Sequence, residues 1–190
     1  ISNIINIKDD EKIIYSMPVY DFNHKEVITI FSKMGMVKRT ALNEFKAMRY
    51  NKPIVCMKLK YDDEIVSVTS SSESEVFIAT NNGYGLWYSA AEIPVVGLKA
   101  SGVKSIKLDE TDEVLVGLPI HKLTDKLAVF NKSGMAKKTS LDEYPIQGRG
   151  GKGLKCSGSE IVGAALIDDT DNILLVGIPN SICISAKDIP

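Results

Sequence analysis

One loop of the sequence carries the residue types that bind anions, namely Gln147, Gly148, Arg149, Gly150, Gly151, Lys152 and Gly153. Glycines let a backbone approach a phosphate closely, and the arginine and lysine add two cations beside its amide groups. This glycine-rich loop (residues 147–153) is no Walker A motif, because Gly153 follows Lys152 where the metal-binding serine or threonine should stand. The loop is therefore either a phosphate-binding element or a glycine-rich turn between two structural units, with its two charges solvated.

The residues that usually carry catalysis or bind metals are few and scattered. Cys56, Cys156 and Cys183 lie far apart without a CxxC pair, and His24 and His121 stand alone. A structural zinc site needs four clustered ligands, and a nucleophile needs an adjacent base. We therefore expect no catalytic residue, no metal site and no cofactor, and we expect the cysteines to act as small buried apolar residues in a reducing compartment.

The chain repeats itself with a period of about 50 residues, which is typical of bladed arrays. The segment Ile28–Thr40 matches Leu127–Thr139 without a gap, and Val76–Tyr88 lies between them. Within each unit, short β-branched and aromatic runs are bounded by turn residues such as Asn-Gly and Ser-Gly, as in β-hairpins. The sequence thus predicts an all-β fold, a propeller-like array of four-stranded blades.

The repeat divides one bladed domain, residues 1–190, into the back half of a blade (1–26), three blades (27–75, 76–125 and 126–172) and the front half of a blade (173–190). The two halves either complete one blade together or belong to a longer array, and a chain without an initial methionine favours a piece of something longer. Only two stretches, around 41–45 and 140–144, have the pattern of a helical turn.

The overall charge at first argues against a nucleic-acid partner. Lys and Arg number 23 and Asp and Glu 24, a net charge of −1, whereas nucleic-acid-binding domains are usually basic. Basic residues nevertheless recur after the hairpin glycines and in the loops equivalent to the glycine-rich loop, and acidic residues recur elsewhere in each unit. Blades related by rotation bring equivalent positions onto one circle, so a neutral total can hide a basic rim. We expect the acidic residues to lie away from that rim.

The cations at these recurring positions are the predicted phosphate contacts, namely Arg149, Lys152, Lys38, Arg39, Lys137, Lys138, Arg49, Lys52 and Lys99. Binding through phosphates is independent of base sequence and strongly salt-dependent. The second unit has Tyr84, Leu86 and Trp87 in place of the basic pair, so we expect a weaker rim there, and we expect Trp87 and Tyr88 to pack between blades. The apolar runs are all far shorter than the roughly 20 residues that span a bilayer, so no membrane segment is expected.

These residues resemble a known family, the C-terminal domain of the A subunit of bacterial type IIA DNA topoisomerases, which comprise DNA gyrase and topoisomerase IV. The glycine-rich loop is similar to the gyrase A-box, usually QRRGGKG, with Gly148 in place of the first arginine. The segments Met36–Thr40 and Met135–Thr139 are similar to the family's repeated G-x-x-K-[RK]-[TS] element. The resemblance covers essentially the whole chain. It implies a β-pinwheel, a propeller variant whose blades exchange strands, with duplex DNA bent around the basic outer rim.

The chain departs from the family pattern in the place of the loop. In gyrase the box belongs to the first blade, whereas here at least two and a half units precede it. The segments 1–22 and 49–55 look more like those of the topoisomerase IV of Gram-positive bacteria, and the full family domain holds more blades than this chain. Gyrase and topoisomerase IV therefore both remain open at this point.

The predicted function is non-catalytic, largely sequence-independent binding and bending of double-stranded DNA for an ATP-hydrolysing type II topoisomerase, which supercoils or decatenates DNA. By the resemblance, the other partners are the remainder of the A subunit and a B-type ATPase subunit, in the bacterial cytoplasm at the nucleoid. The alternative is a bladed protein-interaction module, which interspersed charges around the rim would favour. A propeller enzyme is the weakest interpretation, because no set of polar residues identifies a central active site.

Overall fold

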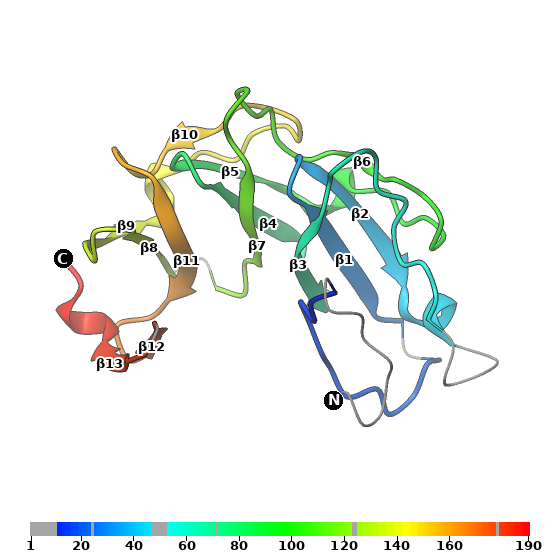
Figure 1. Ribbon diagram of the computed structural model, residues 1–190, viewed down its shortest axis with the longest axis horizontal. Coiled ribbons are helices and arrows are strands. Elements are labelled where there is room, and N and C mark those ends of the chain that lie inside the picture. The colour runs from blue at the N-terminus through cyan, green and yellow to red at the C-terminus, as the bar shows by residue number, and fades with distance from the viewer. Residues whose placement is uncertain (1–10, 24, 47–52, 71, 123–124, 178) are drawn as a thin grey trace.

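The computed structural model describes residues 11–23, 25–46, 53–70, 72–122, 125–177 and 179–190, and the regular secondary structure of these residues consists of short antiparallel strands and 3-10 turns (Figure 1). The strands are β1 (Val27–Ser32), β2 (Met36–Ala41), β3 (Ile65–Ser70), β4 (Glu75–Thr80), β5 (Tyr84–Ser89), β6 (Val103–Lys104), β7 (Val114–Pro119), β8 (Lys126–Asn131), β9 (Ala136–Ser140), β10 (Leu154–Lys155), β11 (Ile161–Ile167), β12 (Asn172–Val176) and β13 (Ser181–Ser185). Single 3-10 turns follow four of them, namely η1 (Leu42–Phe45), η2 (Ala90–Glu92), η3 (Leu141–Glu143) and η4 (Ala186–Asp188).

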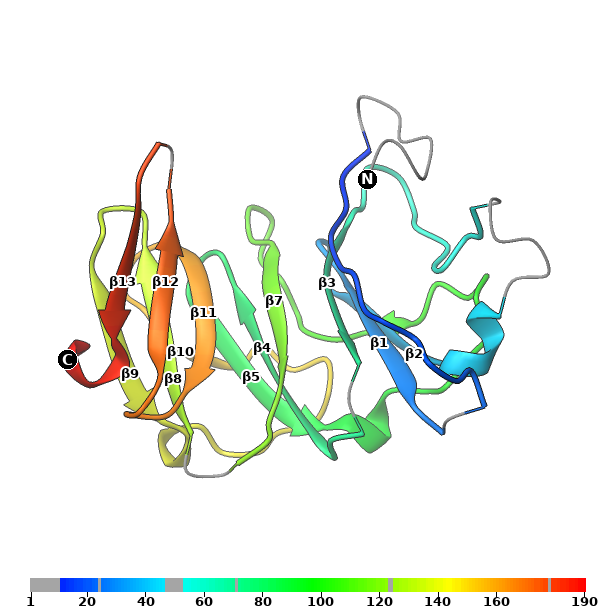
Figure 2. The same cartoon turned by 90° about the horizontal axis from the view of Figure 1, so that it is seen from below.

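Four small sheets follow one another along an arc (Figures 1 and 2). The first sheet has the strand order β3-β1-β2-β6 and the second has the order β10-β5-β4-β7. Within the described residues, the third sheet is β11-β8-β9 and the last is the hairpin β12-β13. The expected all-β class is confirmed, and the first two sheets have the expected four strands.

Two short strands leave their own unit and join the preceding sheet. β6 lies between β5 and β7 in the chain, yet it pairs with β2 through the partners Met36 and Lys104 and the partners Val37 and Val103. In the same way β10 lies between β9 and β11 and pairs with β5. This exchange between neighbouring blades confirms the β-pinwheel that the resemblance implies.

The strands β1, β4 and β8 each contain consecutive buried residues, and because successive side chains of a strand point to opposite sides, both faces of these strands are covered there. In β4, Ile78 packs in one cluster with Phe31 of the first sheet, and Phe77 packs in another with Leu127 of the third sheet. None of these four side chains is more than 1% exposed. Burying a side chain of this size stabilises the fold by about 1.5–3 kcal/mol, so neighbouring sheets hold each other in place.

The two aromatic residues of β5 also lie between blades, as expected. Tyr88 belongs to the cluster between the first and second sheets, and Trp87 to the cluster between the second and third. The Tyr88 hydroxyl lies 2.6 Å from the Ser105 hydroxyl, and burial raises the pKa of Tyr88 to about 12. The Trp87 indole donates to a Glu75 carboxylate oxygen at 3.1 Å. Both rings are therefore structural.

The helical turns expected around 41–45 and 140–144 are η1 and η3. η2 and η4 occupy the equivalent place in the second and fourth units and were not expected. Their N-cap residues Ser89 and Ser185 accept hydrogen bonds from the N–H groups of Ala91 and Lys187 at 3.3 Å. A serine directly before a short segment that ends in an acidic residue is the signal that could have predicted them.

Recurring acidic residues cap the hairpin turns. Asp112 is 7% exposed, and its Oδ2 accepts a hydrogen bond from the Thr80 hydroxyl at 2.7 Å. Its Oδ1 accepts bonds from the backbone N–H groups of Asn82 and Glu113, each at 2.9 Å. Asp63 accepts the equivalent two backbone bonds one unit earlier. Hydrogen bonds to a carboxylate are stronger than hydrogen bonds between neutral groups. Some of the recurring acidic residues therefore stabilise the hairpin turns.

Candidate nucleic-acid interface

The exchanged strands place lysines along one edge of the arc. Lys104 is the second residue of β6 and lies opposite Met36, and Lys155 is the second residue of β10 and lies opposite Tyr84. Both lysines are exposed, and β6 and β10 lie along the same upper edge in Figure 1. We call the exposed cations on and beside these strands the lysine row, namely Lys99, Lys104, Lys107, Lys152 and Lys155.

A glycine precedes each exchanged strand and brings it close to its new neighbour. Gly102 has φ +79° and Gly153 has φ +77°. A Cβ added at Gly102 would lie 2.2 Å from the Val37 carbonyl oxygen, and one added at Gly153 would lie 2.2 Å from that of Gly85. No other residue type fits this conformation and this close approach. The glycine is therefore needed to deliver the lysine two residues later to the edge.

Three members of the lysine row have no partner for their ammonium group among the described residues, and these are Lys99, Lys104 and Lys107. The other two are held. Lys155 donates to the Asn82 carbonyl at 2.8 Å, and its nitrogen lies 4.4 Å from the centre of the Tyr84 ring. The ammonium nitrogen of Lys152 lies 2.9 Å from an Asp109 carboxylate oxygen, and this contact raises the pKa of Lys152. In the described part of the chain, the ammonium groups of the lysine row are therefore unpaired around β6, whereas those around β10 have partners within the protein.

Arg149 of the glycine-rich loop points into the protein rather than outward. Its Nε donates to the Glu92 main-chain oxygen at 2.9 Å, and its Nη1 donates to the main-chain oxygen of Lys104. Its backbone N–H donates to the Glu92 carboxylate at 2.8 Å. The two cations predicted for this loop therefore differ, because Lys152 is exposed and Arg149 is half-buried.

Lys38 and Arg39, which follow the first hairpin glycine, also point toward the protein. Lys38 has no exposed area, and its ammonium group donates to the main-chain oxygens of Gly97 and Leu98 at 2.9 and 2.8 Å. Arg39 is half-buried, and its Nε donates to the Ile93 oxygen at 3.0 Å. Burial lowers the pKa of both groups. We leave Lys38 out of the proposed interface, because a buried ammonium group does not face a ligand.

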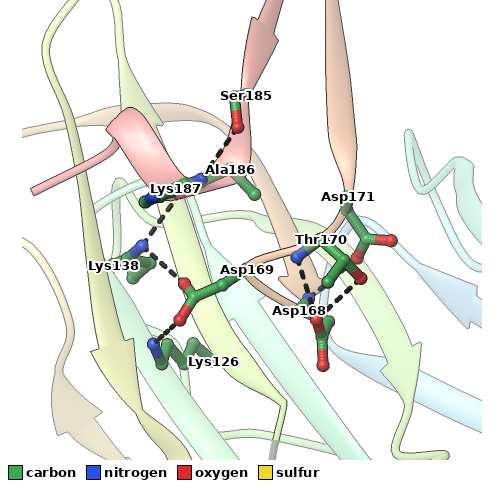
Figure 3. Close-up of polar contacts among 9 residues, drawn as sticks. All are labelled: Lys126, Lys138, Asp168, Asp169, Thr170, Asp171, Ser185, Ala186 and Lys187. Atoms are coloured by element: carbon green, nitrogen blue, oxygen red, sulfur yellow. Dashed lines mark hydrogen bonds and ion pairs between the residues drawn. The ribbon is translucent and has the colours of Figure 1, made fainter.

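The two lysines after the third hairpin glycine, Lys137 and Lys138, differ from each other in exposure. Lys137 is exposed, whereas the Lys138 side chain is 13% exposed and lies 2.7 Å from a carboxylate oxygen of Asp169 (Figure 3). Lys138 also donates to the Ala186 main-chain oxygen at 2.9 Å, and Lys126 lies 2.6 Å from the other Asp169 oxygen. Hydrogen bonds from Lys126 and Lys138 lower the pKa of Asp169 to about 2. Lys138 thus joins the third sheet to the β12–β13 hairpin.

The remaining predicted contacts, Arg49 and Lys52, lie outside the described residues. The expectation that acidic residues keep away from the cations is wrong at three points. Besides the ion pairs of Lys152 and Lys138, the ammonium group of Lys33 lies 3.0 Å from a Glu113 carboxylate oxygen. At these three places the cation lies beside an acidic residue from another part of the chain, namely Asp109, Asp169 or Glu113, so cations and anions are not separated there.

Sequence reasoning missed Lys104, Lys107 and Lys155. A signal was present, because Gly102-Val103-Lys104 and Gly153-Leu154-Lys155 repeat the same pattern at equivalent places in two units. That signal is weak, because the strand that carries each lysine is only two residues long and its partner lies in the preceding unit.

The described residues offer no candidate metal centre. They contain no group of three His, Cys, Asp or Glu side chains that could hold a metal ion. Cys156 is buried, and burial raises the pKa of its thiol to about 11, which leaves little thiolate for nucleophilic chemistry. The groove between residues 12–22 and the first sheet has a volume of about 730 Å³ and a lining dominated by apolar side chains. No helix in the described segments is long and apolar enough to cross a membrane.

Comparison with known proteins gives one family and consistent relatives. A family described as the DNA gyrase C-terminal domain, a beta-propeller, matches residues 26–72, 74–118 and 125–168. The chain is 40% identical over 154 residues to the A subunit of DNA topoisomerase 4 from Bacillus subtilis (strain 168), covering 80% of this chain and 19% of that protein. It is 33% identical over 198 residues to the A subunit of DNA gyrase from Helicobacter pylori, covering 100% of this chain and 24% of that protein. The chain therefore spans about a fifth to a quarter of the length of these relatives.

Solved structures agree with these matches. A crystal structure of the C-terminal domain of DNA topoisomerase IV superposes with a TM-score of 0.94 at 34% identity, covering 100% of this chain and 61% of that one. A structure of the DNA gyrase A C-terminal domain superposes with a TM-score of 0.84, covering 98% of this chain and 64% of that one. At 20% identity the second likeness supports the fold alone.

Proposed function

The chain belongs to the family of the DNA gyrase C-terminal domain, and from that premise we propose that it binds duplex DNA along the lysine row and bends it. The single observation that carries the proposal is the recurrence of exposed lysines on the exchanged strands at one edge of the arc. Lys104 and Lys155 hold the same register position on neighbouring sheets. A duplex that follows this edge meets cations of one blade after another, and each contact pulls the duplex toward the arc.

The chemistry of the row fits a phosphate backbone. Lysine ammonium groups are compact cations that bind phosphate oxygens without reading bases. Binding of this kind releases counterions, so the logarithm of the affinity falls linearly with the logarithm of the salt concentration, by roughly 0.9 per contact. The buried Trp87 and Tyr88 offer no ring for base stacking, in keeping with duplex rather than single-stranded DNA as the ligand.

In the parent protein, we propose that this domain presents bent DNA to a type II topoisomerase that hydrolyses ATP on a separate subunit. The catalytic work then lies elsewhere in the parent chain and in the B-type subunit, in the bacterial cytoplasm. Supercoiling and decatenation are both compatible with the lysine row. A topology assay of the parent enzyme with relaxed and catenated plasmids distinguishes them, since only a gyrase introduces negative supercoils.

The direct test is the salt dependence of duplex binding, measured by fluorescence anisotropy. The triple variant Lys104→Ala, Lys107→Ala and Lys155→Ala should bind more weakly and should lose roughly 0.9 from the salt slope for each phosphate contact removed. A matched control changes Lys25, Lys46 and Lys187 to alanine. These three are also exposed, but they precede β1 or follow η1 and β13, at the ends of the hairpins away from β6.

Wild-type affinity and slope in the triple variant would refute the lysine row as the interface. An equal loss in the control variant would show that only the total charge matters. Bending is read separately, from energy transfer between dyes at the two duplex ends, which should rise on binding to the wild type.

One observation favours the alternative of a protein-interaction module. Acidic residues neutralise Lys33, Lys138 and Lys152, which a solubilising charge pattern would also do. That alternative predicts no binding to linear duplex at low salt, where exposed charges act most strongly. Anisotropy of the wild-type protein with duplex at low salt decides between the two functions.

A further inference from the structure

The glycine-rich loop is tied to the preceding unit by a dense set of hydrogen bonds. Gln147 donates its N–H to the Trp87 oxygen at 2.8 Å, and Gly150 donates its N–H to the Ser105 oxygen at 2.7 Å. Lys107 donates its N–H to the Gly151 oxygen at 2.8 Å. The loop therefore contacts both β5, which is in the second sheet, and the residues around β6, which belongs to the first sheet.

The equivalent loop one unit earlier serves as an internal comparison. Val96 donates to the Arg39 oxygen at 2.8 Å, and Lys58 donates to the Ala100 oxygen at 3.2 Å, which are the counterparts of two of these bonds. Leu98 stands where the glycine-rich loop has Arg149. The two loops thus share a main-chain scaffold, and the later loop adds a guanidinium group to it.

That guanidinium group bridges two sheets. Its Nη1 donates to the main-chain oxygen of Lys104 in β6, and its Nε donates to the oxygen of Glu92 at the end of η2, which follows β5. The arginine's own N–H donates to the Glu92 carboxylate at 2.8 Å. Two of the nitrogens that could bind a phosphate are already engaged with main-chain oxygens inside the protein.

We propose that Arg149 is a positioning residue that fixes β6 against the second sheet and so keeps Lys104 and Lys107 in line with Lys152 and Lys155. In its DNA-binding part this inference rests on the proposed function. The guanidinium geometry matters as well as the charge, because its planar donors reach two oxygens at once and a lysine ammonium group on a flexible stem does not. Arg149 acts on DNA through the lysines, and its own side chain is no phosphate contact.

Two substitutions separate positioning from phosphate contact. Arg149→Lys retains the charge and loses the bridge, whereas Arg149→Ala loses both. The first readout is hydrogen exchange of the free protein at the Ser105 amide, which donates to the Gly35 oxygen at 2.7 Å. Because Ser105 directly follows β6, its exchange rate reports on how firmly β6 is held in the first sheet. Both variants should exchange about tenfold faster there, because bonds from a charged donor are lost. Amides of β8 in the third sheet should exchange at the wild-type rate.

The second readout is DNA binding, with Lys152→Ala as the matched control from the same loop. We expect both Arg149 variants to retain the wild-type salt slope and to give less energy transfer between the duplex ends. Lys152→Ala should lower the slope by roughly 0.9. If Arg149→Ala lowers the slope by the same amount and Arg149→Lys restores it, Arg149 is a phosphate contact and the inference is wrong.

The exchange readout does not depend on DNA. Unchanged exchange at Ser105 in both variants overturns the inference, even if DNA binding changes. If the wild type binds no DNA, the proposed function fails, and the exchange result alone still decides whether Arg149 positions β6.

Discussion

Replacing Gly153 by alanine tests how the exchanged strand β10 is attached. Gly153 has φ +77°, and an added Cβ would lie 2.2 Å from the Gly85 carbonyl oxygen and 2.7 Å from its carbon. Both atoms belong to the main chain of β5, so no side chain can move aside to make room. The loop must therefore withdraw from β5 and take β10 with it.

The loss of stability expected for Gly153→Ala has two parts. A left-handed conformation costs a residue with a Cβ roughly 1–2 kcal/mol relative to glycine. Loosening the short β5–β10 ladder removes hydrogen bonds that contribute about 0.5–1.5 kcal/mol each. Together they predict a loss of about 3 kcal/mol in the free energy of unfolding, which for a chain of this size lowers Tm by about 6–12 °C.

Thermal and urea unfolding, followed by circular dichroism, measure this loss. Gly148→Ala is the matched control, because a Cβ at Gly148 meets no atom within 4 Å and Gly148 is absent from the glycines with positive φ. The control should differ from the wild type by less than about 0.5 kcal/mol. If the two variants are equally stable, close contact at Gly153 does not hold the exchanged strand and the reasoning is refuted.

Three further outcomes follow from the contacts of single side chains. Asp112→Ala removes three hydrogen bonds from a buried turn cap, so urea unfolding should show a loss of about 2–4 kcal/mol, and a neutral effect would contradict the capping role. Lys38→Met should cost about 1–3 kcal/mol while leaving the salt slope of DNA binding unchanged, whereas a phosphate contact would lower that slope by roughly 0.9. Lys126 and Lys138 hold the pKa of Asp169 at about 2, below its unfolded value of about 3.9, so its ionised form stabilises the fold above about pH 4 and this contribution disappears as the pH falls toward 2. The stability difference between the wild type and Asp169→Asn should therefore narrow over that range, and a constant difference would count against the ion pairs.

Much of the fold is predictable from the repeat, because hairpins are local. The run of apolar residues before Gly83 and the aromatic run after it pair with each other across a tight turn, and β4 and β5 lie where this pattern places them. The partners of β6 and β10 are not predictable in this way. A strand of two residues has no hydrophobic period of its own, and the edge that it joins belongs to another unit.

The candidate site shows the same division. Lys38 and Lys137 hold equivalent places in their hairpins, and the sequence alone treats them alike. Lys38 is buried because the loop before β6 closes over β2, whereas the described residues place no such loop over β9, and Lys137 is exposed. Leu86 stands at the same place in the second unit and is fully buried, and an apolar residue there was the signal that this position faces inward.

The sequence by itself determined the strands, the tight turns, the period of the blades and the family, because these depend on side-chain alternation and backbone freedom over a few neighbouring residues. Only the tertiary structure decided which cations face solvent. The exposure of each cation depends on where the exchanged strand and its loop pack, and they pack against a sheet formed by the preceding unit. A guanidinium group in a glycine-rich loop can therefore hold two blades together, while a lysine two residues after a glycine stands on the rim.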